Sequence, residues 1–425
     1  MNTPPVNKQD PEPLVPETLC RKILLFVLIP LTFLGFLTVD LQLVATGFYD
    51  HINLAFDFDQ GYLFKSLSYF SLQFEGNPEA ITLKIKHPLI YLYGLPVMIS
   101  GLMGIERVVA IITITLLFHC TTLYVIFEIL RRLLNNSQQA LLLTLVFISS
   151  ATYLADGTVL DSYAFALFWI TASLWILQKS LMNPPAHFSW ARAGVYVMAV
   201  GTTSYLLLLV LLCEVIMLMH HRTRQTSSFQ IAYLGIGLLK CALIFVALFV
   251  LCYSNILFEL VSSPLEVAKK TLWAVVRPGE KEGILAVSWN FLVNAMVAPK
   301  HIIMEIEPGK MMADFRGTNY IKAVWLINGL LIILYVLALK QIKSPLLQVA
   351  IIWTLINIVF HLEYQDRGSL FLYTGHILAT NIIWLAYGMS RLSIINFSIA
   401  ATLIIACFSY NNVVSIDQAL LAVLP

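Results

Sequence analysis

The stretch Tyr49–Pro96 reads YDHINLAFDFDQGYLFKSLSYFSLQFEGNPEAITLKIKHPLIYLYGLP and follows directly on a long apolar run. It is rich in ionisable side chains, among them Asp50, His51, Asp57, Asp59, Lys65, Glu75, Lys84, Lys86 and His87. A polar stretch joined to apolar runs long enough to cross a bilayer must lie at a water interface or line a cavity. We therefore expect an outer loop here, and expect it to carry the functional site.

The composition of the whole chain places it in a membrane. Of 425 residues, 59% are apolar and only 12% are charged, whereas about 25% charged is usual for a soluble domain. The sequence thus predicts an all-α integral membrane protein whose first partner is the lipid bilayer. A net charge of +2 gives no reason to expect a nucleic-acid partner. The six cysteines show no paired CxxC spacing, so neither disulfides nor a thiolate metal site is expected.

Apolar runs of suitable length predict about eleven transmembrane helices. The runs are Ile23–Val44, Val108–Ile129, Ala140–Leu154, Ala164–Leu177, two short helices that meet near Gly201 within Ala193–Met219, Ile231–Tyr253, Ala323–Leu339, Leu346–Phe360, Leu370–Tyr387 and Ile394–Phe408. Leu89–Met103 is apolar but short and contains Pro96 and glycines, which indicates an interfacial or half-inserted helix in the first outer loop. Counting the Gly201 and Pro96 regions differently gives ten or twelve spans.

The distribution of basic residues orients these spans. With the amino terminus inside, every inner connection is basic: Arg131/Arg132, Lys179/Arg192, Arg222/Arg224, Lys340/Lys343 and Arg391. The predicted organisation is a cytoplasmic tail (1–20), a transmembrane domain (21–411) with outer loops 47–104 and 254–320, and an outer carboxy-terminal tail (412–425). The acidic regions then share the outer face, which favours chemistry at that surface over a relay through the bilayer.

Two aspartates in the first outer loop are the best candidates for a catalytic base. They lie in Asp57-Phe58-Asp59-Gln60-Gly61-Tyr62, and on an extended segment residues i and i+2 face the same way. Two neighbouring carboxylates raise one pKa towards neutrality, as a general base requires. The alternative is an ordinary solvated interfacial loop. Further along, Pro88 restricts His87 to extended geometry, so His87 either begins the next helix or faces a ligand.

Two later polar stretches could complete a site. Asp156 and Asp161 flank the turn between two predicted spans, where an N-cap role explains only one acid. Arg367, Tyr373 and His376 open a late span. The arginine is either a snorkelling anchor or a partner of Asp366, or a fork for a phosphate. His376 is either a buried, satisfied histidine or a ligand to the donor phosphate. The long outer loop adds Lys269, Lys270 and Lys300 among tryptophans, as a lid at headgroup depth would; the alternative is a solvated loop with ordinary surface charge.

Taken together, these residues resemble the GT-C superfamily of membrane glycosyltransferases, which includes protein O-mannosyltransferases and lipid A aminoarabinose transferases. Asp59-Gln60-Gly61-Tyr62, followed by His87-Pro88-Leu89-Ile90-Tyr91, is similar to the family's first outer loop. Gln60 stands where the family has Glu, and Leu89 where it has a second Pro. The resemblance implies that Asp59 acts as general base or orients the acceptor hydroxyl, that Asp161 (or Asp156) is the second acid, and that Arg367 with Tyr373 holds the donor phosphate.

The resemblance also implies a function. A sugar would pass, with inversion, from a polyprenyl-phosphate donor to a lipid-linked or cell-envelope glycan, such as a lipopolysaccharide. The site would face the periplasm from a bacterial inner membrane. No cofactor is certain; a divalent cation (Mg²⁺ or Mn²⁺) could be held by Asp59 and Asp161. The alternatives are an O-antigen-type polymerase or ligase, and a polytopic lipid or glycan transporter.

Overall fold

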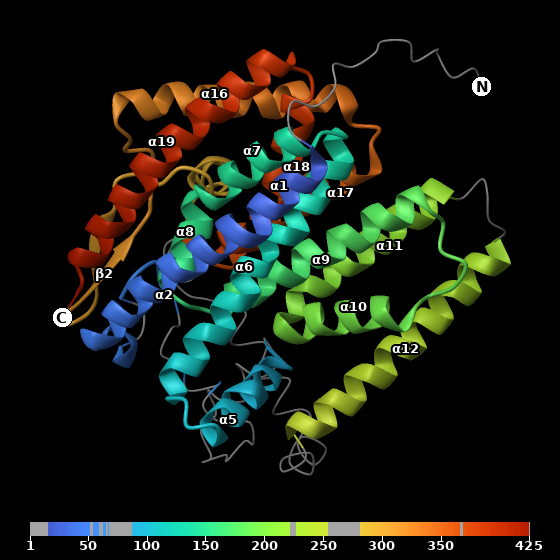
Figure 1. The fold of residues 1–425 in the computed structure, drawn as a ribbon, viewed down its shortest axis with the longest axis horizontal. Coiled ribbons are helices and arrows are strands. Elements are labelled where there is room, and N and C mark those ends of the chain that lie inside the picture. Colours follow the sequence, from blue (N-terminus) through green and yellow to red (C-terminus); the bar gives the residue numbers. More distant parts are fainter. Residues whose placement is uncertain are drawn as a thin grey trace.

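The structure is a computed structural model (Figure 1) that describes residues 16–51, 54–58, 63–64, 67, 87–221, 227–253, 281–365 and 369–424. Its helices are α1 (Glu17–Ile23), η1 (Leu24–Leu28), α2 (Ile29–Ala45), η2 (Phe48–Asp50), η3 (Ile90–Tyr93), α5 (Gly94–Leu102), α6 (Arg107–Leu134), α7 (Ser137–Ile148), α8 (Ala151–Thr158), α9 (Tyr163–Met182), α10 (Trp190–Thr202), η4 (Ser204–Leu206), α11 (Leu207–His221), α12 (Ser227–Tyr253), α15 (Ile284–Trp289), η5 (Asn290–Asn294), α16 (Lys322–Ala338), η6 (Leu339–Gln341), α17 (Pro345–Glu363), η7 (Phe371–His376), α18 (Leu378–Met389) and α19 (Ile394–Leu421). Two strands, β1 (Ile302–Glu307) and β2 (Lys310–Asp314), form a hairpin.

The fold is that of a helical multi-pass membrane protein, as the composition predicts. Within the described ranges, eight helices are long and apolar enough to cross a membrane, or nine if the bent pair α7 and α8 counts as one span. The difference from the predicted count of about eleven transmembrane helices arises where the predicted spans are short or interrupted. One example is Leu370–Tyr387, which divides into η7 and the 12-residue helix α18. The eleven-span count stays a prediction.

The first span is a continuous run of α1, η1 and α2 with a π-helical turn in the middle. That turn, Leu24–Leu28, lies immediately before Ile29-Pro30 at the start of α2. Proline has no N–H to donate to the preceding turn and its ring crowds that turn. A locally widened π turn accommodates both effects without ending the helix.

The break between α7 and α8 is a sharp bend whose backbone groups are hydrogen-bonded by other segments of the chain. The two helices meet at 58°. The N–H groups at the start of α8, which have no partner within the helix, donate to the segment after η5: Ala151 to Met296 O (3.0 Å) and Thr152 to Ala295 O (3.1 Å). From α19, the Asn412 amide donates to Ser149 O (2.8 Å) and Met296 O (2.9 Å). These contacts satisfy backbone groups that a helix end would leave orphaned in an apolar interior.

The predicted pair of short helices around Gly201 is confirmed: α10 ends at Thr202 and α11 begins at Leu207. At the break, the Gly201 carbonyl accepts a hydrogen bond from Leu89 N (2.6 Å). A Cβ at Gly201 would lie 2.3 Å from the Leu89 side chain. Glycine is therefore required where the end of the first long loop packs onto α10.

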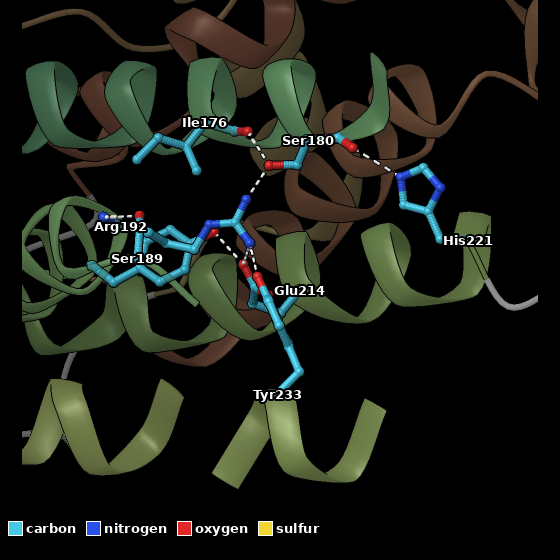
Figure 2. Close-up of polar contacts among 8 residues, drawn as sticks. Ile176, Ser180, Ser189, Arg192, Glu214, His221 and Tyr233 are labelled. Carbon is cyan, nitrogen blue, oxygen red and sulfur yellow. Dashed lines mark hydrogen bonds and ion pairs between the residues drawn. The ribbon is translucent and has the colours of Figure 1, made fainter. Parts of the chain in front are cut away.

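One end of the bundle, which we call the basic end, gathers Arg21, Arg131, Lys179 and Arg192. Arg21 and Arg131 both pair with Glu128 on α6 (3.0 Å each). Arg192 on α10 pairs with Glu214 on α11 (3.4 Å) and donates to Ser180 of α9 and Tyr233 of α12 (Figure 2). This buried ion pair thus joins four helices, including α12, which lies at the edge of the bundle beside α10 (Figure 1).

The opposite end, which we call the loop end, holds the β hairpin and the end of α19. The hairpin falls within predicted outer loop 254–320, where no strands are predicted from the sequence. It gains a third extended segment through a parallel bridge between Ala55 and Ala313. α19 runs to Leu421, so residues 412–421 of the predicted tail continue the helix, with Asn412 and Ile416 buried against the body.

Candidate functional site

Three segments far apart in the sequence meet at the loop end. They are residues 54–58, the stretch from α8 into the start of α9 (156–163), and η7 with its flanks (369–376). The Tyr163 ring lies against Phe58 (ring centroids 6.1 Å apart) and also against His376 (5.0 Å). Phe371 packs on Phe56 (5.4 Å). We take this junction, together with the imidazoles around it, as the candidate site.

The first segment is held in an unusual backbone conformation. Phe56 and Asp57 both have positive φ angles (58° and 59°), which cost of order 1–3 kcal/mol each for residues other than glycine. The conformation is fixed from both sides: Phe56 N–H donates to Ala313 O (2.7 Å), and Phe58 N–H donates to Ala55 O (3.1 Å). Asp57 is consequently buried between two buried phenylalanines. Strain maintained next to a buried acid is typical of functional sites.

The second segment contributes two buried aspartates. Asp156 is on the last turn of α8, and Asp161 is in the turn before α9, where its Oδ1 accepts from Ser162 N–H. The two carboxylates are close enough to repel each other. Asp156 is 2% exposed, and its Oδ2 has no hydrogen-bond partner in the described part of the chain. A buried carboxylate oxygen without a partner is costly, and it is the kind of atom that a ligand satisfies.

Gly375 brings the third segment against the second. A Cβ built on Gly375 would lie 2.9 Å from Asp156 Oδ2 and 3.2 Å from Tyr163 Cβ. Close backbone approach therefore needs glycine at this position. A hydrogen bond from Thr152 Oγ1 to Thr374 Oγ1 (2.7 Å) links the same two elements.

His376 follows Gly375 at the end of η7 and is the least satisfied side chain of the site. It is 6% exposed, and neither ring nitrogen has a hydrogen-bond partner among the residues described. Burial, with His361 and His87 adding to it, lowers the pKa of His376 to about 3. The imidazole is therefore neutral at pH 7 and can present one donor and one acceptor.

A second imidazole and two tyrosines extend the site. His361, at the end of α17, stacks on Tyr373 (ring centroids 4.1 Å apart). Tyr205 of η4 lies near both His361 (6.4 Å) and His376 (5.9 Å). The Tyr205 hydroxyl and His361 Nε2 are buried and have no partner in the described ranges. His87 reaches the same region from the first loop, where its Nδ1 lies 2.6 Å from Thr202 O.

An ion pair borders the site on the hairpin side. Arg316 Nε donates to Asp314 Oδ2 (2.7 Å), and Asp314 Oδ1 accepts from Phe315 N–H (2.8 Å). Burial raises the pKa of Asp314, and Arg316 opposes that rise. Phe315 joins the pair to the site, because its ring packs against Phe56 (4.7 Å) and Phe371 (4.9 Å).

The site residues predicted from sequence divide into three groups. Asp57, Asp161, His87, Tyr373 and His376 lie in the three converging segments or against them. Asp59, Arg367, Lys269 and Lys270 lie outside the residues that the structure describes. Lys300 is exposed at the base of the hairpin, where its backbone N–H donates to Asn319 O (2.8 Å).

The described residues offer no metal site. Among them, no group of three or more His, Cys, Asp or Glu side chains is arranged to hold a metal ion. The suggested ligand pair of Asp59 and Asp161 includes a residue outside the described ranges. No step is therefore assigned to a cation.

Sequence reasoning missed several members of the site. No pattern in the sequence marks Tyr205 or His361 as a site residue, and the resemblance favours Asp161 over Asp156. Tyr205 directly follows the Gly201-Thr202-Thr203-Ser204 break, which is one signal that could have drawn attention to it. His361 lies in one of the polar regions assigned to the outer face, at the end of an apolar run.

Comparison with protein-family models, with curated proteins and with solved structures finds no match to this chain. The class of protein that fold and composition define is a helical multi-pass membrane protein with a buried polar site at one end of the bundle.

Proposed function

We propose that the chain is a membrane glycosyltransferase with a GT-C-like arrangement of about eleven spans. It would move a sugar from a polyprenyl-phosphate carrier to a lipid-linked or cell-envelope glycan. The loop end would face the periplasm of a bacterial inner membrane, since the basic end then faces the cytoplasm.

The convergence of three segments at Tyr163 is the single observation that supports this proposal most. It places the residue before Asp59 (Phe58), the acid pair Asp156 and Asp161, and His376 at one junction. The GT-C resemblance assigns a base to the first segment, a second acid to the next and phosphate binding to the last. The junction is buried yet contains unsatisfied polar atoms, as a site for a sugar phosphate requires.

The proposed reaction is a single displacement at the anomeric carbon. The acceptor hydroxyl oxygen forms the new C–O bond and gives its proton to Asp59. The bond between the anomeric carbon and the phosphate oxygen breaks, and the polyprenyl phosphate leaves with the electron pair. A phosphate is already a good leaving group, so no strong general acid is needed.

Within this reaction the described residues bind and orient. Asp161 and Asp156 would hold sugar hydroxyls or orient the acceptor, because a carboxylate accepts hydrogen bonds from both. His376 and Tyr373 would contact the donor phosphate beside Arg367. The Phe56–Phe58 segment would fix the loop that carries Asp59.

The test is sugar transfer by the purified protein in liposomes, with a panel of radiolabelled polyprenyl-phosphate sugars and membrane glycolipid acceptors. One donor should be consumed, with equal amounts of labelled glycolipid and free carrier phosphate formed. Asp59→Asn should lower that rate by about 100-fold or more. Asp417→Asn, an exposed acid near the loop end of α19, is the matched control and should act as wild type. Equal rates for both variants would remove the assigned base.

A transporter is the second candidate, and one observation favours it. Arg192 and Glu214 form an ion pair that is buried among α9, α10, α11 and α12, and buried charges in spans often mark a transport pathway. Vesicles loaded with labelled lipid-linked sugar separate the two functions. A transporter would move the intact lipid across the bilayer, whereas a transferase would cleave it.

A further inference from the structure

Three histidines from separate parts of the chain gather at the candidate site. His376 ends η7, His361 lies near the end of α17, and His87 precedes η3. His376 lies within electrostatic reach of both others. Tyr205 lies beside His361 and His376 (ring centroids 6.4 and 5.9 Å away) and is itself packed on Phe360 (4.5 Å).

Hydrogen bonds fix the state of two of these rings. His361 Nδ1 faces Tyr364 O (2.7 Å), and His87 Nδ1 faces Thr202 O (2.6 Å). A carbonyl oxygen only accepts, so both Nδ1 atoms carry a proton. In neutral His361 the other nitrogen, Nε2, is then an acceptor, and it is buried without a partner in the described part of the chain. The two nitrogens of His376 are equally unsatisfied.

Imidazoles, tyrosines and a pair of carboxylates surround His376 in the described part of the chain. The groups around it are His361, His87, Tyr163, Tyr205 and, across Gly375, Asp156 with Asp161 behind it; Tyr373 stacks on His361. The pKa of His376 is lowered to about 3 by burial and by the two other imidazoles, so the ring is uncharged when the site is empty.

An anionic ligand would favour the protonated form of His376. A negative charge against a buried imidazole favours the protonated form. A protonated His376 has two N–H donors and no acceptor, which suits phosphate oxygens. The aromatic wall of Tyr205 and Phe360 suits the apolar chain of a lipid more than a free ion.

We infer that the cluster of His376, His361 and His87 is a proton-coupled phosphate site, which is neutral when empty and takes up about one proton as it binds the phosphodiester of a lipid carrier. This inference rests on the proposed function and adds its pH dependence. Affinity for the donor should fall as pH rises, because the proton must come from solution. In the range where one proton is taken up, the Kd should rise about tenfold per pH unit.

The probe is methyl farnesyl phosphate, a diester whose single charge does not change between pH 5 and 8. Calorimetric titration of the purified protein in detergent, in two buffers of different ionisation enthalpy, gives the protons taken up per ligand bound. We expect about one proton at pH 7 for the wild type. Farnesol and inorganic phosphate are run as comparison ligands. Phosphate binding as tightly as the diester, with the same uptake, would overturn the lipid assignment.

Two variants locate the proton. His376→Gln should abolish proton uptake and the pH dependence of Kd. His361→Asn keeps an N–H donor for Tyr364 O but removes the Nε2 acceptor, so it reports on the cluster if His376→Gln fails to fold. His301→Gln is the matched control: it changes a histidine of the loop end with a buried unpartnered nitrogen, and uptake should persist.

The outcomes separate this inference from the proposed function. Diester binding without proton uptake, or uptake unchanged in both cluster variants, overturns the inference while sugar transfer can still be observed. Failure of the diester to bind also overturns it. If the wild-type protein takes up a proton with the diester but transfers no sugar, the transferase assignment is contradicted and the inference of a proton-coupled phosphate site stands.

Discussion

Replacing Gly375 with alanine tests the packing on which the candidate site depends. The new Cβ would lie 2.9 Å from Asp156 Oδ2, 3.2 Å from Tyr163 Cβ and 3.3 Å from Tyr163 Cδ1. Non-bonded carbon contacts are most favourable at about 3.5–4.0 Å, so η7 and α8 must separate by roughly half an ångström. The Tyr163 contact is to its Cβ, which no side-chain rotation can move, so the separation must come from a shift of the backbone.

Two quantities should change in Gly375→Ala. Overpacking of a tight interior costs about 1–3 kcal/mol in the free energy of unfolding. Because a displacement of about 1 Å in a reacting geometry can cost roughly 100-fold in rate, half that displacement should lower sugar transfer by about tenfold. Thermal unfolding in detergent measures the first change, and initial transfer rates at saturating donor measure the second.

Gly329→Ala is the matched control, because nothing lies within 4 Å of a Cβ at that position on α16. Alanine also favours helix over glycine by about 1 kcal/mol, so this variant should be as stable as wild type or more so. If Gly375→Ala matched Gly329→Ala in both unfolding temperature and transfer rate, η7 would not pack on Asp156 as described.

Further predictions concern the basic end, the α7–α8 junction and pH. Arg192→Met and Glu214→Gln should each lower the free energy of unfolding by roughly 3–5 kcal/mol, measured by thermal unfolding. The double variant should lose less than the sum of the two. Strict additivity would show that the two side chains do not interact. Asn412→Leu should cost about 2–4 kcal/mol, since it removes hydrogen bonds to buried backbone groups, whereas exposed Asn396→Leu on the same helix should not. Wild-type protein without added ligand should lose stability as pH falls from about 6.5 towards 3, because the unfolded chain binds protons that buried histidines do not, and His376, with its pKa lowered to about 3, is one of them. His376→Gln should make that part of the profile less steep without removing the slope, since His119 and His361 are also buried; an unchanged slope would assign it to other groups.

Much of the fold can be predicted from the sequence, because the length of an apolar run and the position of helix-breaking residues are local signals. The helix pair around Gly201 follows from four small or polar residues in an apolar run, and Ile90–Leu102 matches the short helix predicted at Leu89–Met103. The π turn before Pro30 also has a local cause.

What the sequence could not show depends on distant partners. The α7–α8 bend exists because Asn412, more than 250 residues later, satisfies the backbone at the break. The hairpin β1–β2 has little alternation of apolar and polar residues, and its third segment, at Ala55, is non-local. For the same reason Tyr205 and His361 carry no local signal of a site: only the fold places them beside His376.

The most direct test of the central claim is the rate at which the reconstituted protein transfers sugar from a polyprenyl-phosphate donor, measured for wild type and for Asp161→Asn. A site formed at the Tyr163 junction predicts measurable turnover by the wild type and a loss of at least about tenfold in the variant, with the unfolding temperature little changed. Turnover by Asp161→Asn at the wild-type rate, or a donor left intact by the wild type, would contradict it.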